Sequence, residues 1–251
     1  MLVIRSLVFN IAFYVVLIGL LIVGLPALFI DRFAVFFVAR LWGKASLWLL
    51  RVICGTKVEF RGAEHIPTGA FIIAPKHQSI WDVFAFLQFF NDFTFILKRE
   101  LTWIPFFGWY LWRGELTAIN RSKGAAALSE ATTQAAAHLA QGRQLFIFPE
   151  GTRRPAGAPP RYKFGVAHIY GENNVPCLPV AHNAGMFWAR RSFIRHPGTV
   201  LVEFLPLIEA GIPKQAFFAR LQETMEAASN RLIDETLAKN PELAATLDRN
   251  G

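Results

Sequence analysis

The sequence predicts an α/β protein in which a mixed, largely parallel sheet is flanked by helices and follows an N-terminal helical membrane anchor. Three observations predict this fold class: an uncharged apolar run near the amino end, short strand-like runs after residue 56, and helix-like segments between them. We therefore divide the chain into two parts. Residues 1–52 form the membrane anchor with an interfacial helix, and residues 53–251 form the α/β domain.

The composition indicates that part of the surface does not face water. Hydrophobic residues make up 53% of the 251 residues and charged residues only 18%, whereas a soluble domain carries about 25% charged residues. The formal net charge of +8 suits a nucleic acid or an anionic membrane, and the apolar excess favours the membrane, so no nucleic-acid partner is expected. Cys54 and Cys177 lie far apart without metal-ligand spacing, which argues against a disulfide framework and a zinc site.

The anchor is predicted from residues 6–30, which contain no charged side chain. A bilayer core requires about 20 apolar residues in a helix. A cleaved signal peptide is the alternative, because Arg5 supplies a short basic start, but the apolar part is too long and no cleavage site of small residues precedes Asp31. We expect a retained anchor, and whether it spans the bilayer or one leaflet stays open.

The following segment, residues 33–52, predicts a helix that lies in the lipid headgroup region. Arg40, Lys44 and Arg51 are spaced by four and seven, which places them on one helical face among Phe, Trp and Leu side chains. Such a helix directs its cations to lipid phosphates and its aromatic rings to the membrane boundary. A second spanning helix whose cations face protein remains the alternative.

The rest of the chain alternates strand-like and helix-like segments. Six short apolar runs have strand length, namely 70–75, 93–98, 115–120, 145–149, 176–181 and 199–205. Residues 122–142, rich in alanine, and residues 214–238, with an apolar side, predict helices. Pro176 and Pro179 restrict their run to a sheet edge or a bulge. Ligands of such sheets bind where strands end, and each motif described below follows a strand-like run.

His77 and Asp82 follow the first of these runs, within the segment "KHQSIWD". A spacing of five places two side chains about 140° apart on a regular helix, so they meet only if His77 lies in a loop and Asp82 in the first turn of a helix. Ser79 suits the start of that helix, and a plain capping box is one interpretation. The other is that Asp82 accepts the Nδ1 proton of His77, which leaves Nε2 free to take a proton from a hydroxyl.

A second motif, "LFIFPEGTRR", suits an anionic ligand. Gly151 permits a tight turn with exposed amides, and Arg153 offers a planar fork for a phosphate, although an ordinary turn with a solvated arginine is the alternative. Glu150 would repel a phosphate unless it binds a hydroxyl or fixes Arg153. Lys98 and Arg121 each end a strand-like run and could reach the same phosphate. Further along the chain, the aromatic-rich stretch 103–112 suits either a lipid docking surface or the core. A second stretch, 186–196, interleaves aromatic side chains with arginines, which suits lipid headgroups and also RNA.

These motifs resemble those of a known family. "HQSIWD" matches the H-Q-S-x-x-D box of glycerolipid acyltransferases, "FPEGTR" matches a second box, and "KREL…IPFFGW…AINR" and "VPCLPVA" look like the other two, in the same order. Over about residues 55–210 the chain resembles the 1-acylglycerol-3-phosphate (lysophosphatidic acid) acyltransferases. It departs from the family pattern at Asn120, where many members have Asp, and at Arg154, where a hydroxyl residue is common.

The resemblance implies transfer of a fatty acyl group from acyl-CoA or acyl carrier protein to the 2-hydroxyl of lysophosphatidic acid, which gives phosphatidic acid. His77 would be the general base and Asp82 its orienting partner. The glycerol phosphate would be held by Lys98, Arg121, Glu150, Gly151, Thr152 and Arg153. No metal or other cofactor is implied, and the site would lie at the cytoplasmic face of the membrane. Another lyso-lipid acceptor, or a catalytically inactive membrane lipid-binding protein, remain the alternatives.

Overall fold

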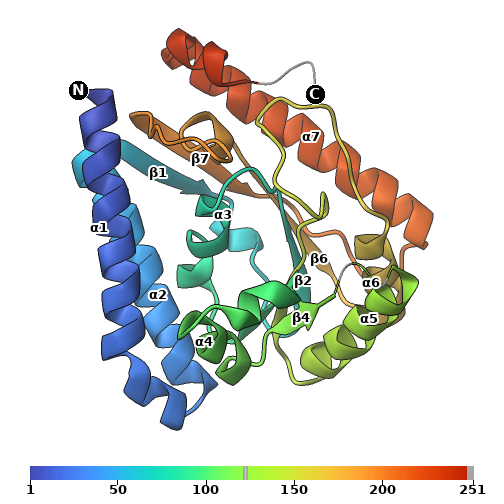
Figure 1. The fold of residues 1–251 in the computed structure, drawn as a ribbon. Coiled ribbons are helices and arrows are strands. Elements are labelled where there is room, and N and C mark those ends of the chain that lie inside the picture. Colours follow the sequence, from blue (N-terminus) through green and yellow to red (C-terminus); the bar gives the residue numbers. More distant parts are fainter. Residues whose placement is uncertain (121, 123, 248–251) are drawn as a thin grey trace.

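In the residues that it describes, 1–120, 122 and 124–247, the computed structural model has a central sheet of seven strands (Figure 1). The strands are β1 (Thr56–Arg61), β2 (Phe71–Pro75), β3 (Phe93–Lys98), β4 (Thr117–Ile119), β5 (Gln144–Phe146), β6 (Cys177–His182) and β7 (Gly198–Phe204). Their spatial order is β1-β7-β6-β2-β5-β3-β4, with β6 and β7 antiparallel and the other neighbours parallel. The predicted mixed, largely parallel sheet is confirmed.

Helices cover the sheet on both sides (Figure 1). They are α1 (Leu2–Val23), α2 (Arg32–Leu49), α3 (Trp81–Phe84), α4 (Phe107–Arg113), α5 (Ala125–Ala140), α6 (Gly165–Asn173) and α7 (Lys214–Lys239). Coverage of both faces explains why all five residues of β2, Phe-Ile-Ile-Ala-Pro, are buried. The helices α5 and α7 match the two predicted ones closely, whereas β1 and α6 were not predicted. The strand β1, Thr-Lys-Val-Glu-Phe-Arg, alternates charged and apolar residues because it lies at the sheet edge.

Pro176 and Pro179 do not mark a sheet edge, because β6 lies between β7 and β2. The alternative expectation, a bulge, is confirmed, because Cys177 bridges Ile208 while Val180 pairs with Phe204, so two residues of β6 lie opposite three of the neighbouring segment. The antiparallel pairing of β6 with β7 extends only from Val180 to His182. Pro179 precedes this short ladder, where a missing N–H removes no bond to β7, and its carbonyl still accepts the N–H of Leu205 at 3.0 Å. An interior strand therefore tolerates proline at the point where one of its neighbours begins to pair.

The helices α1 and α2 pack against the α/β part through aromatic side chains. Phe9 and Phe13 of α1 are 0% and 2% exposed, and both rings meet the ring of Trp188 edge-on, with centroids 5.3 and 5.5 Å apart. These residues belong to one hydrophobic cluster with the sheet, so residues 1–52 and the rest of the chain share a core. The domain boundary after residue 52 stays a prediction.

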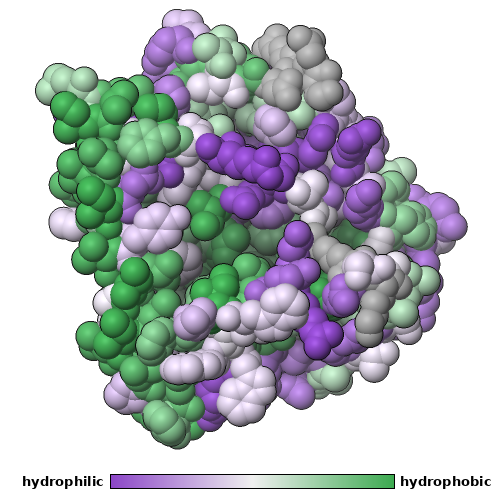
Figure 2. Space-filling view, in the orientation of Figure 1, coloured by the Kyte–Doolittle hydropathy of each residue, from purple (hydrophilic) through white to green (hydrophobic). Residues whose placement is uncertain are grey.

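The outer surface of α1 and α2 is strongly apolar, and Figure 2 shows hydrophobic residues gathered along this side of the molecule. The segments Leu2–Val23 and Arg32–Cys54 are each long and apolar enough to cross a membrane, by length and composition. Arg40 does not share this outward face, because its Nη1 donates to the carbonyl oxygens of Phe90 at 3.3 Å and Asn91 at 3.4 Å. The guanidinium of Arg40 thus faces the protein rather than lipid phosphates, as the alternative interpretation of this helix expected.

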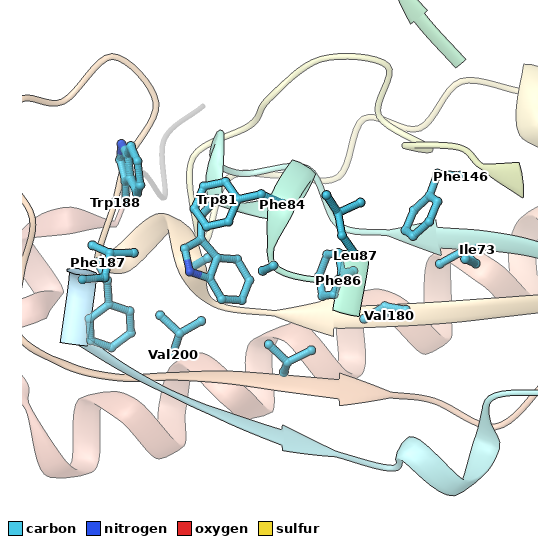
Figure 3. Packing of buried hydrophobic residues seen from close by; sticks show 14 of the residues in the cluster. Ile73, Trp81, Phe84, Phe86, Leu87, Phe146, Val180, Phe187, Trp188 and Val200 are labelled. Carbon is cyan, nitrogen blue, oxygen red and sulfur yellow. The ribbon is translucent and has the colours of Figure 1, made fainter. Parts of the chain in front are cut away.

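Aromatic side chains also hold the short helix α3 against the sheet. Trp81 and Phe84 are each 1% exposed and Phe86 is 0% exposed, and Figure 3 shows all three among the side chains of the core. Asp82 lies in the same helix and is 0% exposed. A four-residue helix has little stability of its own, so this packing determines where the Asp82 carboxylate lies.

Candidate active site

The predicted chemical residues gather at one edge of the sheet. His77 follows β2, Glu150 follows the neighbouring strand β5, and Lys98 ends β3. These three strands run parallel, so their carboxyl ends meet at the same edge, where ligands of α/β sheets bind. Arg121 lies outside the described residues.

His77 and Asp82 are in contact, as predicted. Nδ1 of His77 lies 3.1 Å from Oδ2 of Asp82, and the same oxygen accepts the backbone N–H groups of Gln78 at 2.6 Å and Ser79 at 2.8 Å. Oγ of Ser79 accepts the N–H of Trp81 at 3.2 Å. The structure thus shows the contact between His77 and Asp82 together with half of a capping box, because Asp82 accepts the N–H of Ser79 but Ser79 Oγ accepts the N–H of Trp81 rather than that of Asp82.

The His77 imidazole is oriented from two directions. Its ring stacks on Phe148, with centroids 3.9 Å apart and planes 20° apart. The Asp82 carboxylate can only accept, so Nδ1 carries the proton and Nε2 is the basic nitrogen. The His77 side chain is 15% exposed while that of Asp82 is 0% exposed. The pair thus has a buried orienting end and an accessible end for proton transfer.

Glu150 faces the protein interior. Its Oε1 lies 2.8 Å from Nζ of Lys76, and its Oε2 accepts the backbone N–H of His77 at 2.7 Å. The Lys76 ammonium also bonds Oε1 of Glu226 on α7, at 2.7 Å. Burial lowers the pKa of Lys76, but the two carboxylates outweigh this effect and leave the pKa raised. Glu150 therefore supports the His77 loop rather than fixing Arg153, and its contact with the substrate stays a prediction.

The segment from Gly151 to Arg154 is tied to the same loop. Gly151 has φ +69°, a left-handed conformation that favours glycine, and its N–H donates to the Phe148 carbonyl at 2.9 Å. The N–H of Arg154 donates to the His77 carbonyl at 2.7 Å. Arg153 is half-buried and Thr152 is exposed, as is Lys98 at the end of β3. The structure thus brings the second motif beside His77, with polar side chains at the surface.

Among the residues with ionisable side chains, three that contact this site were not predicted, namely Lys76, His182 and Glu226. A charged residue directly after the buried strand β2 was the available signal for Lys76, and a histidine at the end of a strand was the signal for His182. Glu226 had no local signal, because its partner Lys76 lies 150 residues earlier in the chain.

The two aromatic stretches divide between core and surface. In the second, Arg195 is 5% exposed, its guanidinium lies 4.0 Å from the ring centroid of Trp188, and Nη2 donates to Asn10 at 2.7 Å. Burial lowers its pKa to about 10. In the first stretch, Trp109 and Trp112 are 51% and 77% exposed. The second stretch thus contributes to the core, and the first leaves large apolar side chains at the surface.

A histidine–carboxylate pair at the carboxyl edge of a mixed sheet is the arrangement of an α/β protein suited to acid–base chemistry with an imidazole. Comparison with known proteins then identifies the family. A family model described as Acyltransferase matches residues 57–183. The 1-acyl-sn-glycerol-3-phosphate acyltransferase of Pseudomonas aeruginosa is 37% identical over 203 residues, which cover 81% of this chain and 77% of that protein. The chain therefore belongs to the Acyltransferase family.

Two further comparisons agree. The crystal structure of the 1-acyl-sn-glycerophosphate (LPA) acyltransferase PlsC from Thermotoga maritima matches with a TM-score of 0.78 and 25% identity, and the match covers 92% of this chain and 98% of that chain. The 1-acyl-sn-glycerol-3-phosphate acyltransferase alpha of Mus musculus is 30% identical over 160 residues, which cover 62% of this chain and 56% of the mouse protein. The fold is thus shared over nearly the whole chain.

Proposed function

We propose that this protein transfers a fatty acyl group from acyl-CoA or acyl carrier protein to the 2-hydroxyl of 1-acyl-sn-glycerol 3-phosphate, which gives phosphatidic acid. The contact of His77 with Asp82, 3.1 Å between Nδ1 and Oδ2, carries this proposal. The relatives described above are named for this activity, which supports the proposal.

In the proposed reaction, Nε2 of His77 takes the proton of the acceptor hydroxyl as its oxygen forms a bond to the thioester carbonyl carbon. Asp82 stabilises the imidazolium that results. The carbon–sulfur bond of the tetrahedral intermediate then breaks, and the leaving thiolate takes the proton from His77. No acyl-enzyme and no cofactor take part, and holding both substrates together supplies much of the rate.

Arg153, with Thr152 and the tight turn at Gly151, is proposed to hold the phosphate of the acceptor, and Lys98 and Arg121 complete the predicted set. The bond between Arg154 N and the His77 carbonyl, 2.7 Å, supports a phosphate position close to the base. A guanidinium suits this task because its planar fork matches two phosphate oxygens.

The protein is further proposed to bind the membrane through α1 and α2, with the active site at the cytoplasmic face. The large apolar side chains exposed on this hairpin include Ile4, Ile11, Val15, Ile18, Phe33, Phe37 and Trp48. Replacing Ile4, Ile11 and Ile18 by serine preserves the core residues Phe9 and Phe13. We expect this triple variant to fold but to sediment less with anionic lipid vesicles. Equal sedimentation of variant and wild type would contradict the assignment.

The decisive experiment is thiol release from acyl-CoA by the purified protein, with lysophosphatidic acid and a panel of other lyso-lipids as acceptors. Replacing His77 by alanine removes the base, so we expect the rate to fall about 10²- to 10⁴-fold. His168 on α6 is half-buried and provides the matched control, His168→Ala. If thiol is released only with a different lyso-lipid, that lyso-lipid is the acceptor and lysophosphatidic acid is not. If no acceptor gives thiol release from acyl-CoA or from acyl carrier protein, the proposal is refuted.

Arg153→Ala tests the phosphate position. We expect it to raise the KM for the phosphate acceptor far more than the KM for the thioester, because only the acceptor loses its charge partner. Arg220 is exposed on α7, and Arg220→Ala should leave both constants unchanged. Equal increases in both KM values for Arg153→Ala would rule out a dedicated phosphate contact.

A further inference from the structure

The segment His182–Gly185, at the end of β6, lies against the His77 loop and has no role in the reaction proposed above. His182 and Asn183 are both 0% exposed, and Ala184 is 1% exposed. Burying a polar side chain destabilises the fold unless the side chain is hydrogen-bonded. Two consecutive buried polar residues beside an active site therefore need a structural explanation.

The contacts of His182 determine its tautomer. Its Nδ1 accepts the backbone N–H of Ala184 at 3.2 Å, so this nitrogen carries no proton. The proton is therefore on Nε2, which donates to the carbonyl oxygen of Lys76 at 2.8 Å. Burial lowers the pKa of His182, so that the ring stays neutral. Because Lys76 directly precedes His77, this bond holds the peptide from which the catalytic loop begins.

The same N–H lies close to the orienting carboxylate. Oδ2 of Asp82 accepts three donors, whereas Oδ1 is buried and has no hydrogen-bond partner among the described residues. Nε2 of His182 is 3.6 Å from Oδ1, which is too long for a hydrogen bond but close enough for a favourable electrostatic contact. His182 thus faces both the start of the loop and the buried side of the carboxylate that orients His77.

The rest of the segment is anchored to the core. Asn183 accepts the N–H of Leu201 at 2.9 Å and donates to Thr236 Oγ1 at 2.6 Å, which joins β7 and α7. The N–H of Gly185 donates to Oε1 of Gln78 at 2.9 Å, and a Cβ at Gly185 would lie only 3.0 Å from Cβ of Gln78. The segment is therefore both fixed in place and in direct contact with the loop that carries His77.

We propose that His182 is a positioning residue for the acyl transfer, and that its Nε2–H holds the Lys76 carbonyl and the Asp82 carboxylate in the arrangement that orients His77. The inference rests on the proposed role of His77 as the base. His182 itself touches neither substrate. Its effect is therefore expected in kcat, because a misoriented base slows proton transfer without weakening the binding of the phosphate or of the acyl chain.

Two substitutions in the full-length protein test this role. His182→Leu removes the N–H at similar volume, and we expect kcat to fall on the order of 10- to 100-fold with little change in the KM for lysophosphatidic acid. His182→Gln restores an N–H at about the position of Nε2 and should recover most of that loss. His168→Leu is the matched control and should leave both constants unchanged. Unchanged kcat in His182→Leu, a rise in KM alone, or no recovery with glutamine would each overturn the proposal.

A second measurement uses the unaltered protein, so it does not require an inactive variant to fold. Nitrogen–proton correlation spectra of the unaltered protein report the tautomer of each of its six histidines. We expect His182, assigned by the loss of its signal in His182→Gln, to be the neutral Nε2–H form near pH 7, because burial lowers its pKa. An Nδ1–H tautomer, or a doubly protonated ring near pH 7, would overturn the proposal. Failure of His77 as the base would instead appear as retained activity in His77→Ala, so the two outcomes are distinguishable.

Discussion

Replacing Lys76 by methionine tests the buried ion cluster formed by Lys76, Glu150 and Glu226. The Lys76 ammonium lies 2.8 Å from Glu150 and 2.7 Å from Glu226, and the Lys76 and Glu150 residues are 5% and 1% exposed. At an effective dielectric constant of about 20, each contact contributes about 6 kcal/mol of attraction, most of which is offset by the desolvation of the charges. Methionine keeps much of the side-chain volume and removes the charge.

The expected magnitude follows from the carboxylates that remain. Removing one partner of a buried ion pair costs about 3–5 kcal/mol, which for a chain of this size lowers Tm by about 6–20 °C. Burial raises the pKa of Glu150, and Lys76 opposes this rise. Without Lys76, the pKa of Glu150 in the folded variant therefore exceeds its unfolded value of about 4.3. Folding of the variant is then coupled to proton uptake by Glu150, so the variant gains stability as the pH falls.

The stability lost relative to wild type is thus greatest at neutral pH and shrinks toward pH 4.

Thermal unfolding followed by intrinsic fluorescence measures this effect, since the chain has seven tryptophans. The matched control is Lys214→Met, because Lys214 pairs with Glu172 at the surface, where the side chains are 33% and 48% exposed. A surface pair contributes about 0–1 kcal/mol, so the control should change Tm by no more than about 4 °C. If both variants lose the same stability, or if the loss for Lys76→Met does not shrink at low pH, the cluster does not stabilise the loop as described.

Two further predictions concern stability. Gly108→Ala should lower Tm markedly, because its Cβ would lie 2.0 Å from the carbonyl oxygen of Thr102. Gly19→Ala should leave Tm unchanged or slightly raised, because its Cβ would have no atom of the described part of the chain within 4 Å. Equal Tm values for the two alanine variants would refute this contrast. Arg61 lowers the pKa of Glu235 to about 2, so the stability that wild type has over Glu235→Gln should be complete above about pH 4.5 and should disappear as the pH falls to about 2. A difference that persists at pH 2 in chemical denaturation would show another origin.

Much of the candidate site was predictable because its contacts are local. A hydroxyl residue followed three positions later by a carboxylate predicts the start of a helix, and this turn, held by the packing of α3, brings Asp82 to within 3.1 Å of His77. The strands preceding His77 and Glu150 were likewise readable as short apolar runs. The orientation of Glu150 was not, because whether a carboxylate turns toward a ligand or toward Lys76 depends on the burial of both groups.

The sequence by itself determined the fold class and the apolar surface of the first two helices, since each depends on periodicity or composition. Its spacing of five residues made the pairing of His77 with Asp82 possible, and the packing of α3 decided it. Only the tertiary structure decided that β6 lies inside the sheet beside β2, and hence that His182 donates to a carbonyl 106 residues earlier in the chain. It also decided that Phe9 packs against Trp188 and that Glu226 reaches Lys76. These contacts depend on strand order and helix packing, which bring distant segments together. The residue pattern of one segment does not indicate which distant segment it will contact.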